Sequence, residues 1–318
     1  MNSELTIRTG EFPIIIEPKT PMAASLDGLK DILHRDRDRW LSLLSTKGAL
    51  LFRGFDVLSV PSYVSFAATI IPVPGSYTLG DSPRSLVADG VYTSTDYPAQ
   101  YPISLHQELS YSARWPKFIS FYCATPPSSG GVTPIADFRM MLQALPKDLV
   151  SEFVTKRLSY SRNLHGGYGL GKSWMDTLNT KSKKDAEQLL RSIDARFTWT
   201  EQGNLSITET VSAVIDHRTS GEPVWFNQAE QWHSSAIDPD VRSAMLDLMP
   251  EKSFPHYVEF GDGTPISSSH LSEIRRAQES LAVRSAWELG DVLWLDNELV
   301  AHGRDSFKGA RKILVSLG

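Results

Sequence analysis

The sequence predicts a mainly β protein with inserted helices, built on a double-stranded β-helix, the jelly-roll arrangement of two facing sheets. Many short apolar runs are separated by turn residues, and segments with helical spacing lie between them. No repeat of fixed period and no low-complexity tract occurs, which argues against a solenoid and against a disordered chain. A jelly roll also brings an early and a late strand to one barrel mouth, where side chains converge.

Length and composition predict one domain. The 318 residues are 41% hydrophobic, enough to bury a substantial core, and we expect residues 1–318 to form a single domain. The formal net charge is −5 and no run rich in Lys and Arg occurs, so no nucleic-acid partner is expected. Residues 1–8 lack the pattern of a signal peptide, and no stretch is long enough to span a bilayer. We therefore expect a cytoplasmic protein with no membrane partner.

The first hundred residues predict two helices, a buried strand and a long loop. Residues 25–45 carry apolar side chains near helical spacing among charges, which indicates an amphipathic helix ending at Lys47-Gly48. Residues 48–55 form an apolar run with glycine near both ends, typical of a buried strand. A short helix is expected over 61–71, because proline is tolerated in a first turn. Residues 75–100 are rich in Ser, Thr, Pro, Gly and Asp and predict an irregular loop.

The remaining elements follow from the same patterns. Residues 117–124 predict a strand, 126–134 a turn-rich loop, and 140–145 and 146–156 two helices. Further along the chain we expect a helix at 183–193, a hairpin of 196–200 and 205–208, a strand at 223–227, helices at 239–248 and 268–281, and strands at 285–289, 291–295 and 312–317.

Cysteine content limits the metal chemistry that the chain can support. Cys123 is the only cysteine, so neither an intrachain disulfide nor a thiolate-rich metal site can form. We expect Cys123 to be a small buried apolar residue. Any metal ion must therefore be held by imidazole and carboxylate groups.

The stretch 104–110 contains a candidate metal-binding pair. In an extended chain, His106 and Glu108 point to the same face while Gln107 points away, so both could reach one ion. A His-X-Glu triplet alone is weak evidence, because a chain of this length contains on the order of one His-X-Asp/Glu by chance. A third ligand from a distant histidine would complete the 2-His-1-carboxylate triad that holds ferrous iron. The best candidate is His302, near the C-terminus.

With their neighbours, these residues resemble the TauD/TfdA family of iron(II)/2-oxoglutarate-dependent oxygenases. The matching stretches are 48–55, 106–108, 130–134 and 290–297, followed by His302 and Arg311. Within the family, the chain is most similar to the SyrP-like branch, whose members oxidise amino acids, often tethered to a carrier protein, in peptide natural-product pathways. This narrower resemblance is carried by the stretches 161–167, 222–228 and 302–313.

The resemblance implies roles for particular residues. His106, Glu108 and His302 would bind Fe(II). Arg311 would bind the distal carboxylate of 2-oxoglutarate through its planar guanidinium, and the Thr133 hydroxyl would donate to the same group. Other family members place this arginine further past the histidine, so Arg304 is an alternative. Asp296 and Asn297, in the stretch that precedes His302, would shape the turn or orient ligands. The candidates for substrate binding are Arg162, His165, Asn227 and His233.

The implied reaction consumes 2-oxoglutarate and O2 at iron and releases succinate and carbon dioxide while an amino-acid-like substrate, free or bound to a carrier protein, is oxidised. Because Glu108 fills the carboxylate position, no vacancy is left for chloride. Halogenation is therefore disfavoured, whereas hydroxylation, desaturation and related oxidations all stay open.

Two other readings belong to different classes. A non-catalytic jelly-roll binding protein would keep the fold with a degenerate metal site. A zinc hydrolase would use similar ligands, yet it would leave Arg311 and Thr133 without a role.

Overall fold

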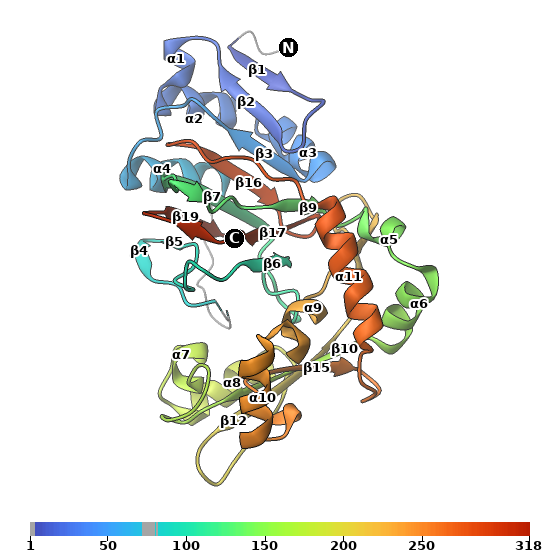
Figure 1. Cartoon of the computed structure of the whole chain (residues 1–318). Coiled ribbons are helices and arrows are strands. Elements are labelled where there is room, and N and C mark those ends of the chain that lie inside the picture. The colour runs from blue at the N-terminus through green and yellow to red at the C-terminus, as the bar shows by residue number, and fades with distance from the viewer. Residues whose placement is uncertain (1–3, 72–79, 81) are drawn as a thin grey trace.

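The computed structural model describes residues 4–71, 80 and 82–318. Its largest sheet runs through the upper half of the molecule (Figure 1) and joins the two ends of the chain, because strands from residues 49–52 and 292–296 pair directly. In spatial order its eight strands are β1 Leu5–Arg8, β2 Ile14–Pro18, β3 Ala49–Phe52, β16 Val292–Asp296, β7 Phe118–Thr125, β19 Lys312–Leu317, β5 Val91–Thr93 and β4 Leu86–Ala88.

A smaller sheet packs against this one, and two of its strands carry the predicted metal ligands His106 and His302. Its three strands are β6 Ile103–His106, β17 Val300–Arg304 and β9 Ile135–Asp137. Side chains of both sheets, such as Phe121 and Leu105, belong to one buried apolar cluster. Beside it, β18 Phe307–Lys308 pairs with β8 Ser129–Gly130. The two layers are those that the predicted jelly roll requires.

The central strands of the eight-stranded sheet, such as β3 and β16, are buried on both faces. Along β3 the side chains alternate, so that Leu51 joins the cluster between the two sheets while Leu50 and Phe52 join a second cluster beneath the N-terminal helices. The helices over that outer face are α1 Pro21–Ala24, α2 Leu26–Arg35, α3 Arg37–Lys47 and α4 Val60–Ile70. This double burial explains why the strand is an uninterrupted apolar run in the sequence.

The middle of the chain forms the lower part of the molecule in Figure 1. A four-stranded sheet there has the order β11 Arg196–Trp199, β12 Leu205–Val211, β10 Leu158–Leu164 and β15 His256–Phe260. Around it and beside the smaller sheet lie α5 Met141–Ala144, α6 Lys147–Lys156, α7 Trp174–Leu178, α8 Lys183–Ser192, the pair β13 Val214–Asp216 and β14 Pro223–Trp225, α9 Ala229–Trp232, the 3-10 helices Ser234–Ala236 and Glu251–Ser253, α10 Pro239–Leu248 and α11 Ser268–Leu281.

Most of the predicted elements are confirmed. Helices α10 and α11 have the predicted bounds, and the hairpin of β11 and β12 is present. The predicted helix over 25–45 is divided into α2 and α3 because Asp36 adopts φ −112°, ψ 28°, outside the helical region. It ends where expected, since Gly48 takes the left-handed conformation at φ 80°.

Two predictions are wrong. Residues 285–289 form a loop instead of a strand, because side chains bind their backbone: Arg53 donates to the Ala286 carbonyl and Asp291 accepts from the Glu288 N–H. The predicted loop over 75–100 contains β4 and β5, and β5 pairs with β19 at the edge of the large sheet. Within that loop prediction, residues 75–79 and 81 lie outside the described residues.

In the described part of the chain, none of the helices has the length and apolar character needed to cross a membrane.

Candidate active site

The structure brings the three predicted metal ligands together. In the smaller sheet His302 of β17 is the direct cross-strand partner of His106, the last residue of β6, and their ring centroids lie 4.5 Å apart. Glu108 follows in the next turn, with its Oε2 atom 3.9 Å from His302 Nε2. One ligand atom from each residue lies within 4.8 Å of the other two, and all three side chains are buried.

The position of Glu108 has a different origin from the one the sequence suggested. The strand ends at His106, and the chain turns at once, with Leu109 at a positive φ of 59°. Asn297 fixes this turn: its Oδ1 accepts the Glu108 N–H at 2.8 Å, and its Nδ2 donates to the Glu108 carbonyl at 3.0 Å. The alternation of an extended strand therefore does not place Glu108, whereas the segment before His302 does.

Gln107 points away from the histidines, as predicted. Its Nε2 donates to the carbonyls of Trp225 and Glu298, at 2.9 and 3.2 Å. Its own carbonyl accepts from Gln228 Nε2 at 2.6 Å. The stretch 222–228, which carried part of the resemblance, thus supports the turn at 107–109 that carries Glu108.

The protonation state of both histidines suits metal binding. His106 Nδ1 lies 2.9 Å from the Ser104 carbonyl, which can only accept, so Nδ1 carries the proton and Nε2 keeps its lone pair. Burial lowers the pKa of His106. Burial, the neighbouring His106 and the charge of Arg84 together hold the pKa of His302 well below its ordinary value. Both rings are therefore neutral at pH 7, the form that binds a metal.

Arg84 is a part of the site that sequence reasoning missed. Its Nη2 lies 2.6 Å from Glu108 Oε2, and the two side chains are 2% and 4% exposed. Arg84 precedes β4, in a segment whose composition indicated only a long polar loop. The length of that loop is the one sequence signal that points to the region.

Thr133 and Arg311 lie beside the histidines and line the same cavity. The Arg311 Nη2 donates to Thr133 Oγ1 at 3.3 Å, and its Nε donates to the Gly131 carbonyl at 2.8 Å. Burial, with Arg304 nearby, lowers the pKa of Arg311 to about 10, so it stays cationic at pH 7. The cavity is lined by Ser82, Arg84, Ser94, Thr95, Ile103, His106, Phe121, Thr133, His302, Gly303, Arg304 and Arg311.

The alternative arginine, Arg304, is bound to the backbone. Its two terminal nitrogens donate to the carbonyls of Tyr97, Pro98 and Tyr101 at 2.6–2.7 Å. Arg311, in contrast, forms no ion pair with the described residues. A buried cation without a carboxylate beside it is the group that needs an anionic ligand, which favours Arg311 over Arg304.

The four predicted substrate residues lie outside the lining of this cavity. Arg162 on β10 is buried and pairs with Glu209 at 2.9 Å, while the Asn227 amide binds the Ala213 carbonyl and the Ala229 N–H. His165 directly follows β10 and accepts the Gly167 N–H, and His233 accepts the Ser235 N–H at the start of a 3-10 helix. The Arg162 guanidinium lies 5.4 Å from the ring centroid of Tyr111, three residues past Glu108.

Comparisons with known proteins agree with this picture. The sequence model of the family described as "Taurine catabolism dioxygenase TauD, TfdA family" matches residues 16–317. DdaC, a dapdiamide synthesis protein of Enterobacter agglomerans, is 34% identical over 275 residues, covering 86% of this chain and 83% of the relative. A clavaminate synthase-like protein of Arabidopsis thaliana is 30% identical over 327 residues, covering 96% of this chain and 93% of the relative.

Solved structures confirm the predicted fold class. PvcB of Pseudomonas aeruginosa superposes with a TM-score of 0.54 at 16% identity, over 96% of this chain and 84% of that one. Another structure of PvcB describes it as an Fe, alpha-ketoglutarate dependent oxygenase from an isonitrile synthetic pathway, and superposes with a TM-score of 0.53. At this identity the likeness establishes the fold, a double-stranded β-helix with inserted helices.

Proposed function

This chain belongs to the TauD/TfdA family of 2-oxoglutarate-dependent dioxygenases, which use Fe(II) and O2, and on that premise we propose that the cavity between His106 and Arg311 is its active site. The observation that carries the assignment is the convergence of two neutral imidazoles and a carboxylate beside a buried arginine. These groups come from segments far apart in the sequence: the two histidines and Arg311 line one cavity, and Glu108 lies against His302.

In the proposed site, His106 Nε2, the Glu108 carboxylate and His302 hold the iron. Two atoms that bind one ion at about 2.1 Å each can be no more than about 4.2 Å apart. The observed separation of His302 Nε2 and Glu108 Oε2, 3.9 Å, fits this limit. The set is also chemically suited to ferrous iron, since two imidazoles and one carboxylate leave positions open for the co-substrates.

The proposed site for 2-oxoglutarate is formed by Arg311 and Thr133. A guanidinium matches a carboxylate in two parallel hydrogen bonds, and a hydroxyl adds a third donor. The buried charge of Arg311 would be compensated by the distal carboxylate when the co-substrate binds. Iron held there would supply, with 2-oxoglutarate and O2, an oxidant strong enough to attack a C–H bond. The chain would supply the ligand geometry, the buried surroundings of the three ligands and the orientation of the substrate.

The proposed substrate is an amino acid or a compound derived from one, oxidised in natural-product biosynthesis. The names of DdaC and PvcB connect those two proteins with such pathways, and the SyrP-like stretches of this chain support the same class. We propose hydroxylation or desaturation, because Glu108 is directed at the metal position and leaves no vacancy for chloride. Delivery by a carrier protein belongs to this proposal as the alternative to a free substrate.

Succinate release tests the proposal. The enzyme would be incubated with Fe(II), 2-oxoglutarate and O2 across free amino acids and aminoacyl carrier proteins, and products would be identified by mass. We expect one substrate class to raise succinate release and to gain one oxygen or lose two hydrogens. His106→Ala should abolish the stimulated release. Equal turnover by this variant would overturn the assignment, and no turnover with any candidate would favour a binding protein.

A further inference from the structure

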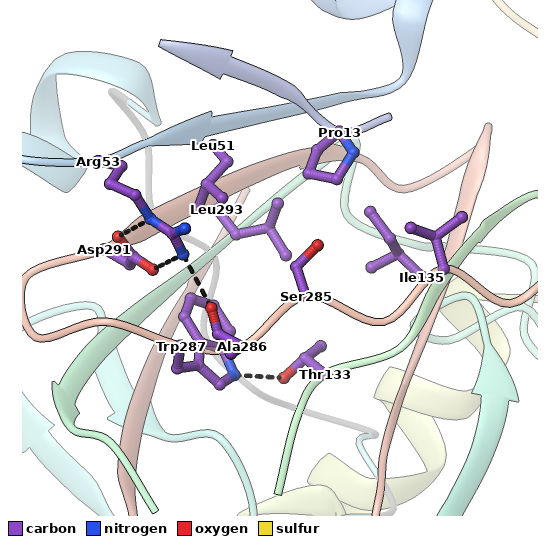
Figure 2. A pocket seen from close by; sticks show the side chains of 11 residues that line it. Pro13, Leu51, Arg53, Thr133, Ile135, Ser285, Ala286, Trp287, Asp291 and Leu293 are labelled. Carbon is purple, nitrogen blue, oxygen red and sulfur yellow. Dashed lines mark hydrogen bonds and ion pairs between the residues drawn. The ribbon is translucent and has the colours of Figure 1, made fainter. Parts of the chain in front are cut away.

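Trp287 contacts Thr133 in a cavity that the histidines do not line. Its indole Nε1 lies 3.2 Å from Thr133 Oγ1, as Figure 2 shows for the small cavity that these side chains line. Thr133 therefore lies between two cavities: the one in Figure 2, and the one that holds Arg311 and the histidines. Trp287 belongs to the segment 285–289, and no sequence motif assigns it a role.

Counting hydrogen bonds fixes the direction of the Thr133 hydroxyl. A hydroxyl has one proton to donate and two lone pairs that accept. Both lone pairs are engaged, since the indole N–H of Trp287 and the Nη2 of Arg311 can only donate, and they lie 3.2 and 3.3 Å from Oγ1. In the described part of the chain, the hydroxyl proton has no acceptor. It is thus left to point into the cavity shared with Arg311.

We infer that Trp287 is a positioning residue for 2-oxoglutarate, because it makes the Thr133 hydroxyl a donor toward the distal carboxylate of that co-substrate. Without the indole N–H, the hydroxyl could rotate and present a lone pair to the carboxylate, which would weaken binding. The inference rests on the proposed function and adds a residue to it. A carboxylate oxygen can only accept, so the fixed donor matches the charge of the ligand.

Two motif residues without a role so far hold Trp287 in place. Arg53, directly after β3, and Asp291, directly before β16, form an ion pair at 2.6 Å, drawn with dashed lines in Figure 2. The same Arg53 group donates to the Ala286 carbonyl at 2.8 Å, and Asp291 accepts the Glu288 N–H at 2.8 Å. The ion pair thus fastens both neighbours of Trp287 and fixes the approach of the indole to Thr133.

A binding titration tests the inference without relying on turnover. In the absence of oxygen, 2-oxoglutarate would be titrated into the Fe(II) protein, and its Kd read from the weak visible charge-transfer band. Trp287→Phe keeps the aromatic ring and removes the N–H. We expect its Kd to rise roughly three- to tenfold, the effect of one lost hydrogen bond. The control Trp199→Phe, which removes an indole bond to Glu187 in the distant β11 hairpin, should leave the Kd unchanged.

A double-mutant cycle separates positioning from general disturbance. In a Thr133→Val background the hydroxyl is absent, so Trp287→Phe should add no further loss, whereas in Thr133→Ser the loss should persist. An equal loss in the valine background, or an unchanged Kd in Trp287→Phe, would overturn the inference while the proposed function stands. A folded wild-type protein that gives no band would overturn the proposed function itself.

A second variant guards against misfolding of the first. Arg53→Lys keeps a cation beside Asp291 but lacks the planar fork that also reaches Ala286. It should raise the Kd in the same direction by a smaller factor, with kcat at saturating 2-oxoglutarate preserved. A fall in kcat with an unchanged Kd would contradict the positioning role.

Discussion

The Asn297 side chain holds the backbone of Glu108 and so connects the segment before His302 with the turn after His106. It accepts from the Glu108 N–H and donates to the carbonyls of Glu108 and Pro116. We predict that Asn297→Ala weakens Mn(II) or Fe(II) binding about 10- to 100-fold, the range for groups that orient a ligand. Anaerobic metal titration measures this.

The matched control for that variant is Asn163→Ala. Asn163 also donates to two carbonyls, those of Lys252 and Phe254, but it lies on β10 outside the site. Its replacement should leave the metal affinity unchanged. If both variants lose affinity equally, the effect of Asn297 is general destabilisation and the orienting role is wrong.

Two buried imidazoles give the metal-free protein a pH-dependent stability. In the folded state the pKa values of His106 and His302 lie below 6.5, the ordinary value. Below that pH the unfolded chain binds more protons, so the free energy of unfolding decreases as pH falls, by up to about 1.4 kcal/mol per pH unit for each ring. Well above pH 6.5 the rings are neutral in both the folded and the unfolded chain, so the free energy of unfolding is not reduced. Urea unfolding with a chelator at pH 7.5, 6.5 and 5.5 measures the slope.

A variant isolates the contribution of the site to that slope. In His302→Gln one of the two imidazoles is absent, so its stability should depend less steeply on pH between 6.5 and 5.5. Identical slopes for wild type and variant would show that the acid sensitivity arises elsewhere.

Cys123 is predicted to be chemically inert. The thiol is fully buried on β7, and burial raises its pKa to about 12. Because the thiolate is the reactive form, the native protein should resist alkylation by iodoacetamide at pH 8, whereas the urea-unfolded chain should react. Mass spectrometry counts the adduct, and rapid labelling of the native protein would contradict the buried position.

At the scale of elements, the Arg53–Asp291 pair couples β3, β16 and the loop before β16. Asp291 is 1% exposed, while the Arg53 side chain is 20% exposed. Arg53→Met should lower the free energy of unfolding by about 3 kcal/mol, because it leaves a buried carboxylate unpaired. Asp291→Leu in the same chain should restore part of that loss. Urea unfolding of the single and double variants checks both, and an additive loss would contradict the pairing.

The elements that sequence patterns predicted well are those with one dominant local signal. Helices α10 and α11 begin after Asp238 and Ser267, whose side chains accept backbone N–H groups at the first turn. Strand β10, with the sequence LSYSRNL, was missed because polar residues interrupt it, and its neighbours β12 and β15 supply the pairing that makes it a strand. The strand predicted at 285–289 is absent for the converse reason: its residues alternate like a strand, but contacts from Arg53 and Asp291 hold its backbone in a loop.

At the scale of the whole molecule, some residues of the candidate site were predictable from the sequence and others were not. Residue types and chain order predicted the three ligands, Arg311 and Thr133 as a group. The structure clusters His106, Glu108 and His302, and it places the two histidines in one cavity with Thr133 and Arg311. The roles of Arg84 and Trp287 could not be predicted from the sequence, because their contacts depend on how distant segments meet. The four substrate candidates were chosen as polar loop residues, a property shared with many residues that only satisfy the backbone.

We propose that the whole chain unfolds as one domain. The large buried cluster contains residues of the jelly-roll sheets and of the middle segment, among them Phe121, Phe153 and Val258. Such a shared core predicts a single transition in urea, coincident by tryptophan fluorescence and far-UV circular dichroism. Two separated transitions would show that the middle segment is a domain of its own.

The most direct test of the central claim is the visible spectrum of the anaerobic protein with Fe(II) and 2-oxoglutarate. If His106, Glu108 and His302 hold the iron next to Arg311, the wild-type protein should develop a weak charge-transfer band that saturates with 2-oxoglutarate, and His302→Ala should lack it. A folded wild-type protein without the band, or a variant that keeps it at full intensity, would contradict the account.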